Sequence, residues 1–235
     1  MGAAPVITID GPGGAGKGTL CALLAVDLQW DVLDSGALYR VVAWHAERQG
    51  WQHWQGADVE RAAAAALALD IRFVSRPRHS TQIYCDNVDV TAQIRSSAAS
   101  EAASRWAALA PIRAALLARQ RAFRQPPGLL ADGRDMGTVV FPDATLKLFV
   151  TASAAERARR RLQQLQAAGQ LSAGDDNAML RRIETEIRAR DDRDASRAAS
   201  PLQPAADAIV IDTTGESVSA SLQKVRGFMR RRDWR

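Results

Sequence analysis

Short apolar runs rich in β-branched residues alternate with amphipathic helical patterns along the chain. Runs of this kind, bounded by Gly, Pro or Asp, predict buried strands. The predicted strands are Val6–Asp10, Asp31–Asp34, Leu129–Asp132, Leu146–Val150 and Ala208–Asp212. The predicted helices are Lys17–Leu28, about Leu38–Gln49, Asp58–Ala68, Ser97–Ala108, Ile112–Arg124, Glu156–Ala168, Met179–Arg193 and a last one from about Ser217. Strands that alternate with helices at this spacing favour βαβ units, so we predict a three-layer α/β fold with a five-stranded parallel sheet.

One stretch breaks the alternation. Ile71–Ser75, Gln82–Cys85 and Val88–Val90 are short β-prone runs joined by turn-forming residues. They predict a small antiparallel β insert after the alanine-rich helix. The polar segment Gly169–Asn177 predicts a mobile loop tip.

The composition is that of a folded, soluble chain. Hydrophobic residues make up 47% of the 235 residues and charged residues 24%, which excludes a disordered protein. Cys21 and Cys85 form neither a disulfide framework nor a metal-binding spacing. The apolar runs are far shorter than the roughly 18 residues of a spanning helix, and the first residues show no secretory signal. We therefore expect a cytoplasmic protein with no membrane partner.

The net charge of +5 is carried by 28 Arg and only three Lys. A basic surface attracts nucleic acid, but Arg also grips the phosphates of small ligands with its planar fork. A bias that places Arg instead of Lys on solvated faces would give the same count. Charge alone does not choose among these readings.

The segment Gly11-x-x-x-x-Gly16-Lys17 predicts a phosphate-binding loop, because it directly follows a predicted strand and opens a predicted helix. Its backbone N–H groups and the helix N-terminus would hold phosphate, and Lys17 would add a full positive charge. Gly18 stands where Ser or Thr usually follows the lysine and holds Mg²⁺. The metal would therefore depend on nucleotide phosphates, water and a carboxylate, for which Asp132 is the candidate. A Gly-Lys-Gly-Thr sequence is common in nucleoside monophosphate kinases, and the chain lacks the Asn-Lys-x-Asp motif of GTPases.

Three further motifs give the loop a family context. They are Asp34–Arg40, Asp132–Thr138 and Arg190–Asp194. With Ile7–Pro12 and the long run Ala131–Asp143, they make the chain closely similar to the bacterial-type cytidylate kinases. The similarity extends from Val6 to Asp212, nearly the whole chain.

The resemblance implies a reaction and a domain organisation. The reaction would be direct in-line transfer of the γ-phosphoryl group of ATP to CMP or dCMP, with Mg²⁺, in pyrimidine nucleotide metabolism. The chain would be one domain of 235 residues and a monomer. Its parts would be a core (about 1–36, 108–158 and 195–235), a monophosphate-binding part with the β insert (about 37–107) and a mobile lid (about 159–194).

The resemblance also implies site residues. ATP would be bound by Gly11, Pro12, Gly13, Gly14, Ala15, Gly16, Lys17, Gly18, Thr19 and Arg157. CMP would be bound by Ser35, Arg40, Ser104, Arg113, Arg134, Asp135, Arg190, Asp194 and Arg197. Lys17, Arg134 and Arg190 would be catalytic and spread positive charge around the transferred group. Arg159, Arg160 and Arg161 share the predicted helix of Arg157, so the choice among them stays open.

Physical arguments accompany two of these assignments. Cytosine presents an N4 amino donor that uracil lacks, and a carboxylate such as Asp135 can accept from it. Arg190, Asp194 and Arg197 are spaced at i, i+4 and i+7, which would place them on one face of a helix. A solvated helix with internal ion pairs is the alternative explanation of that run.

Two rival functions remain at this stage. A kinase for UMP or AMP would keep the loop and the arginines but differ at the base contacts. A nucleic-acid motor would suit the basic tail Arg230–Arg235, but a second ATPase motif is missing. We therefore expect ATP, CMP and dCMP, and no nucleic acid, as partners. His45, His53 and His79 are scattered and carry no expected role.

Overall fold

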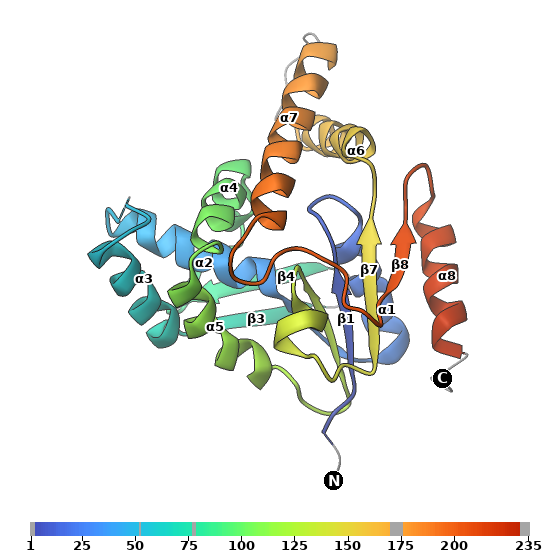
Figure 1. Cartoon of the computed structure of the whole chain (residues 1–235), viewed down its shortest axis with the longest axis horizontal. Coiled ribbons are helices and arrows are strands. Elements are labelled where there is room, and N and C mark those ends of the chain that lie inside the picture. The colour runs from blue at the N-terminus through green and yellow to red at the C-terminus, as the bar shows by residue number, and fades with distance from the viewer. Residues whose placement is uncertain (1–2, 52, 77–78, 170–175, 231–235) are drawn as a thin grey trace. The chain divides into compact units, whose positions relative to one another are not determined.

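The structure is a computed structural model that describes residues 3–51, 53–76, 79–169 and 176–230 (Figure 1). The chain divides into two compact units. The first consists of the described residues of Met1–Leu33 and Arg124–Arg235, and the second is Asp34–Phe123.

The first unit is built on a five-stranded sheet in the order β2-β6-β1-β7-β8. The strands are β1 (Val6–Asp10), β2 (Asp31–Asp34), β6 (Leu129–Gly133), β7 (Leu146–Thr151) and β8 (Ile209–Asp212). The central strand β1 pairs in parallel with β6 and β7, and β7 pairs in parallel with β8. All five residues of β1 are buried, as is typical of a strand covered on both faces. The predicted α/β fold with a five-stranded parallel sheet is confirmed.

Parallel pairing brings three loops to one edge of this sheet. Asp10 at the end of β1 is in register with Gly133 of β6 and with Phe149 of β7. The glycine-rich loop after β1, the Arg134 segment after β6 and the chain after β7 therefore leave the sheet side by side. This carboxyl edge is where open α/β sheets bind ligands.

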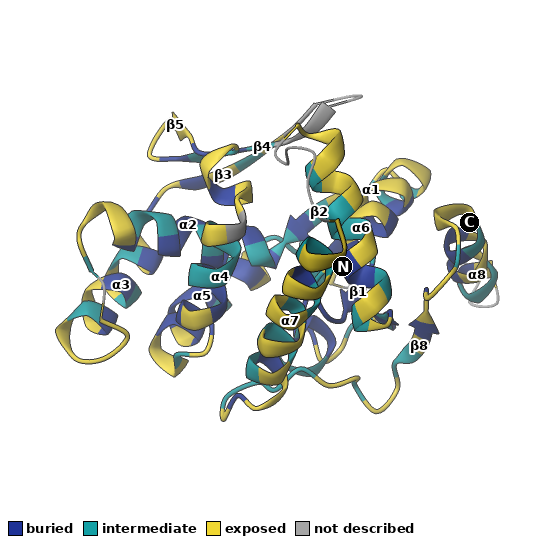
Figure 2. Ribbon diagram, turned by 90° about the horizontal axis from the view of Figure 1, so that it is seen from above, coloured by how far each residue is buried: buried dark blue, intermediate teal, exposed yellow. Residues whose placement is uncertain are grey.

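The described residues of the first unit include the α-helices α1 (Lys17–Leu28), α6 (Ala154–Ala167), α7 (Asp176–Ala195) and α8 (Val218–Arg230). Leu20 and Leu24 of α1 share one apolar core with Val225 and Met229 of α8 and with the sheet. Leu23 of the same helix is 37% exposed. Helix α7 buries few side chains and is exposed along much of its length (Figure 2).

The part of the second unit that the structure describes is built from α-helices and a small sheet. The helices are α2 (Ser35–Arg48), α3 (Ala57–Ala68), α4 (Ser97–Trp106) and α5 (Ala110–Ala122), and the short 3-10 helix η1 spans Gln93–Arg95. The strands β3 (Ile71–Arg76), β4 (His79–Cys85) and β5 (Val88–Asp89) pair in that order and are antiparallel. Asp86 and Asn87 both have positive φ, the backbone conformation of a tight hairpin turn. The predicted antiparallel insert is confirmed.

The structure corrects three expectations of helix extent. Helix α2 begins at Ser35 instead of about Leu38, because the Asp34 carboxylate caps it by accepting from the Ala37 N–H at 3.0 Å. Helix α7 ends at Ala195, so Arg197 is not on it. A five-residue π-helix, η2 (Met136–Val140), follows β6 where no helix was expected.

Two other observations concern the predicted loop and membranes. Most of the predicted loop tip Gly169–Asn177 lies outside the described residues. Among the helices that the structure describes, none combines the length and apolarity needed to cross a bilayer.

Candidate active site

The glycine-rich loop leaves β1 at Gly11 and ends at Gly16, which caps α1 in a left-handed conformation with φ of 94°. No described side chain caps α1. The first N–H groups of a helix have no partner within it and carry partial positive charge. The loop and the first turn of α1 therefore offer backbone donors to an anion.

Lys17 begins α1 and folds back over this loop. Its Nζ donates to the Pro12 carbonyl at 2.9 Å and lies 3.8 Å from Oδ1 of Asp132. Burial, reinforced by the positive charge of Arg134, lowers the pKa of the Lys17 ammonium to about 8. The side chain is still mostly positive at neutral pH, so it can pair with a phosphate at the loop.

Two arginines from distant segments lie against the loop. Arg134 follows β6 and Arg190 is on α7. A Cβ atom built on Gly13 would lie 3.3 Å from Nη2 of Arg134 and 3.4 Å from Nη1 of Arg190. The sequence assigned both residues to the transferred phosphate, and the structure brings both guanidinium groups to the loop with Lys17.

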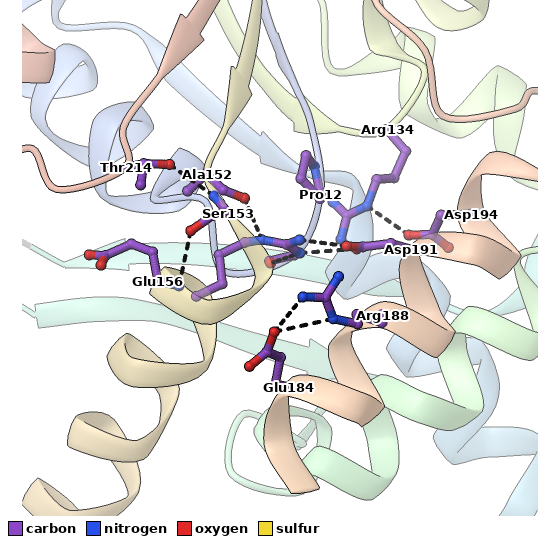
Figure 3. Close-up of polar contacts among 12 residues, drawn as sticks. Pro12, Arg134, Ala152, Ser153, Glu156, Glu184, Arg188, Asp191, Asp194 and Thr214 are labelled. Carbon is purple, nitrogen blue, oxygen red and sulfur yellow. Dashed lines mark hydrogen bonds and ion pairs between the residues drawn. The ribbon is translucent and has the colours of Figure 1, made fainter. Parts of the chain in front are cut away.

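Asp194 of α7 is buried among these cations. It accepts from Nε of Arg134 at 3.0 Å (Figure 3) and also pairs with Arg197. Burial acts to raise the pKa of Asp194, but the charges of Arg134, Arg197 and Arg190 hold that pKa below its ordinary value. Arg197 thus reaches the same cluster from beyond the end of α7, by its ion pair and not by sharing a helix face.

Arg157 and Arg160 of α6 border the loop from the other side. Arg157 is 4% exposed. Its Nε donates to Ala152 O at 2.8 Å and its Nη1 to Gly13 O at 3.2 Å. Arg160 donates from Nη2 to the carbonyl of Thr213 at 2.6 Å. Arg159 and Arg160 both pair with Glu156, but the Arg159 side chain is exposed.

Asp10 was not singled out by the sequence, although it is a carboxyl at the end of an apolar strand directly before the loop. Its two oxygens accept from the backbone N–H groups of Met136 and Gly137, each at 2.8 Å. Burial raises the pKa of Asp10 to about 7, although the two backbone donors lower it. Asp10 therefore joins the end of β1 to the start of η2.

Asp135 lies between Arg134 and η2 and is buried. Its carbonyl accepts from the N–H of Val139 at 2.9 Å, which closes the first turn of η2. This short helix and its contact with Asp10 fix the backbone that carries Arg134 and Asp135.

Asp132 is the carboxylate nearest to the start of α1. A Cβ atom on Gly18 would lie 3.6 Å from its Oδ2, so Asp132 lies beside the position where other loops carry a hydroxyl. Carboxylate oxygen is a ligand that Mg²⁺ accepts, usually together with water and substrate phosphates. Within the described ranges, no three His, Cys, Asp or Glu side chains are grouped closely enough to hold a metal ion by themselves. Asp132 therefore fits as a single carboxylate ligand of a magnesium ion whose other ligands would come from water and a bound phosphate.

The remaining predicted residues belong to the second unit. Ser35 is buried at the start of α2, and Nη1 of Arg40 lies 4.0 Å from Oδ2 of Asp34. The Arg113 guanidinium lies 5.6 Å from the centroid of the Tyr39 ring.

Arg113 also contacts the end of α4. Its Nη1 donates to the Ala107 carbonyl at 3.1 Å, and Ser104, one turn earlier on α4, is buried. The second unit therefore gathers Arg113 with Tyr39 and with the helix that carries Ser104.

Comparison with known proteins gives this arrangement a family. The family model described as cytidylate kinase matches residues 7–230. Cytidylate kinase of Pseudomonas entomophila (strain L48) is 51% identical over 231 residues, which are 98% of this chain and 97% of the relative. Cytidylate kinase of Enterobacter sp. (strain 638) is 49% identical over 230 residues, 98% of this chain and 97% of the relative.

A solved structure, TT1252 from Thermus thermophilus, aligns over 98% of each chain with 18% identity and a TM-score of 0.48. The sequence matches, however, cover nearly the full length of both partners at about half identity. The chain belongs to the cytidylate kinase family.

Proposed function

We propose that the protein transfers the γ-phosphoryl group of ATP to CMP or dCMP and releases ADP and the corresponding diphosphate. The observation that carries this proposal is the convergence of cationic side chains on the loop before α1. Lys17, Arg134 and Arg190 come from three separate segments of the first unit, and all lie against the loop. Membership of the cytidylate kinase family supports the choice of substrates.

The chemistry needs no covalent intermediate. A phosphoryl group that passes in line between two phosphate oxygens requires positioning and neutralisation of charge. The backbone donors of the loop would hold the ATP phosphates, with Arg157 at its edge. Lys17, Arg134 and Arg190 would stabilise the charge that spreads over the transferred group.

Asp132 is the residue we propose to hold Mg²⁺ together with the phosphates of ATP. The ion would supply further neutralisation of phosphate charge. Lys17 lies close to the same carboxylate, so Asp132 would orient both positive groups.

We propose that the acceptor nucleotide is recognised by the residues that the family resemblance assigns to it. From the first unit we assign Arg134, Asp135, Arg190, Asp194 and Arg197. From the second we assign Ser35, Arg40, Ser104 and Arg113. Asp135 would accept from the cytosine N4 amino group, a hydrogen bond that uracil cannot form, and this difference would disfavour UMP.

We further propose that the chain acts as a monomer in the cytoplasm. Its parts would be a core of about 1–36, 108–158 and 195–235, a monophosphate-binding part of about 37–107 and a lid of about 159–194. Closure of such a lid would exclude water from the reaction and limit ATP hydrolysis.

A substrate survey tests the function directly. ADP production with Mg·ATP is measured with CMP, dCMP, UMP, AMP and GMP as acceptors. We expect rapid turnover with CMP and dCMP and at least tenfold lower kcat/KM with the other three. Preference for another base would retain a kinase and overturn the assigned acceptor. Absence of turnover with all five, in a folded protein, would overturn the proposed function.

A further inference from the structure

Helix α7 presents a second carboxylate to the loop, and the proposed function gives it no role. Asp194 pairs with Arg134, as described above, and Asp191, one turn earlier, pairs with Arg157 (Figure 3). The two ion pairs attach α7 to two arginines that lie against the same loop.

The contact between Asp191 and Arg157 is bidentate. Nη1 of Arg157 lies 3.0 Å from Oδ1 of Asp191, and Nη2 lies 2.5 Å from Oδ2. A carboxylate that engages both nitrogens of the fork fixes the plane of the guanidinium group as well as its position. A single hydrogen bond or a lysine would leave that plane free.

The other contacts of Arg157 direct the same group toward the loop. Its Nε is held by Ala152 O at the end of β7, and its Nη1 also reaches Gly13 O. A Cβ atom on Gly14 would lie 3.4 Å from the Cβ of Arg157. The Arg157 side chain therefore lies across the loop, and Asp191 is its hydrogen-bond partner on α7.

Charge explains why such a partner is needed. Arg190 precedes Asp191, and its guanidinium is close to Gly13, as is that of Arg134. Cations gathered this closely repel each other, and a neighbouring carboxylate favours the charged group that it contacts. Without Asp191, Arg157 would face this concentration of positive charge with only carbonyl acceptors.

We propose that Asp191 is a positioning residue that holds the Arg157 guanidinium at the loop and thereby sets the affinity for ATP. This inference rests on the proposed function, since it assumes that Arg157 contacts the nucleotide phosphates. Asp191 acts through Arg157 and touches no acceptor nucleotide, so its loss weakens the binding of ATP and not that of CMP.

The chain offers a matched control. Asp192 follows on the same helix and is exposed, and none of the described contacts gives its carboxylate an arginine partner. Asp191→Asn and Asp192→Asn remove the same charge from the same turn. A merely structural or long-range electrostatic effect would be similar in the two variants.

The experiment measures Mg·ATP binding by calorimetry and the KM values for ATP and CMP in both variants. Loss of a charged bidentate contact predicts about a tenfold weaker Kd and a higher KM for ATP in Asp191→Asn. The KM for CMP is expected to stay within about twofold. Asp192→Asn should match the unmodified protein, and Asp191→Glu should recover part of the ATP affinity.

A double-mutant cycle tests whether Asp191 acts through Arg157. In an Arg157→Ala background, Asp191→Asn should cause no further loss of ATP affinity. Equal ATP binding by Asp191→Asn and Asp192→Asn, or a full loss in the Arg157→Ala background, would overturn the positioning role. A protein that binds Mg·ATP normally but phosphorylates no acceptor would instead contradict the proposed function, so the two failures can be distinguished.

Discussion

Arg134 and Asp194 form a buried ion pair at 3.0 Å that joins the segment after β6 to the last turn of α7. Asp194 is 1% exposed and also pairs with Arg197. One carboxylate therefore compensates two guanidinium groups. Its removal would take this carboxylate away from both arginines.

Asp194→Ala is expected to lower the free energy of unfolding by about 3 kcal/mol at pH 7, because it removes the buried carboxylate that pairs with Arg134 and Arg197. The pKa of Asp194 is held below its ordinary value, so its contribution is present above the unfolded pKa and is lost as pH falls through the folded one. The difference from the unmodified protein should therefore shrink below about pH 4. Urea unfolding at several pH values measures this difference in the free energy of unfolding, with the exposed Asp192→Ala as control. A decrease of less than about 0.5 kcal/mol in the free energy of unfolding at pH 7 would show that Asp194 contributes little to stability.

Lys17→Met is expected to lower kcat by at least about a hundredfold, because a positive group aimed at the transferred phosphate is lost. The fold should persist, since Met fills similar space and removes a buried charge. ADP production and thermal melting are the measurements. Lys224→Met on α8, at an exposed position, is the control. Normal turnover in Lys17→Met would show that the loop is misassigned.

Asp135→Ala is expected to reduce the preference for CMP over UMP more than it reduces the affinity for ATP. The variant has no carboxylate to accept from the cytosine N4 group, so CMP would lose a hydrogen bond that UMP never forms. The ratio of kcat/KM for the two acceptors measures the effect. Asp143→Ala, an exposed carboxylate of the same segment, should leave the ratio unchanged. If the ratio is also unchanged in Asp135→Ala, Asp135 does not take part in recognising the cytosine base.

Asp10 is expected to make stability depend on pH near neutrality. The folded carboxyl has a pKa of about 7, whereas the unfolded one loses its proton near about pH 4. Between these two pH values the folded chain binds more protons than the unfolded chain, so rising pH lowers the free energy of unfolding. The loss amounts to about 4 kcal/mol over the whole window, at about 1.4 kcal/mol for each pKa unit.

Asp10→Asn cannot ionise and should lack this loss. Urea unfolding of both proteins at intervals from pH 4.5 to 8 would show the unmodified protein losing stability relative to the variant. Other titrating groups cancel in the comparison. Parallel stability curves would show that Asp10 is charged throughout this range.

The sequence predicted the strands of the sheet because the residues within each strand are enough to identify it. Val6–Asp10 and Leu146–Val150 are β-branched or aliphatic runs that suit a buried parallel strand wherever they occur. The insert was predictable for the same reason, since Asp86-Asn87 is a turn sequence with its own backbone preference. The loop from Gly11 to Lys17 was predictable because its context, a strand before and a helix after, is equally local.

Contacts between distant segments were not predictable in this way. The hydrogen bonds from Met136 and Gly137 to Asp10 depend on the register of β1 with β6. The periodicity that placed Arg197 on α7 assumed a continuous helix, but the helix ends at Ala195. The resemblance supplied the arginines of the site and Asp194, while the pairing of Asp191 with Arg157 required the structure.

Gly11 has a φ of 141°, and a Cβ atom on it would lie 1.9 Å from the carbonyl oxygen of Val150. That oxygen belongs to β7, the neighbour of β1, so the collision arises from the spacing of two strands and involves no nucleotide. Glycine is the one amino acid that avoids it. The first residue of the loop is thus already dictated by the folding of the sheet. A selection for stability alone, applied to a variant that has lost its activity, would keep glycine at this position.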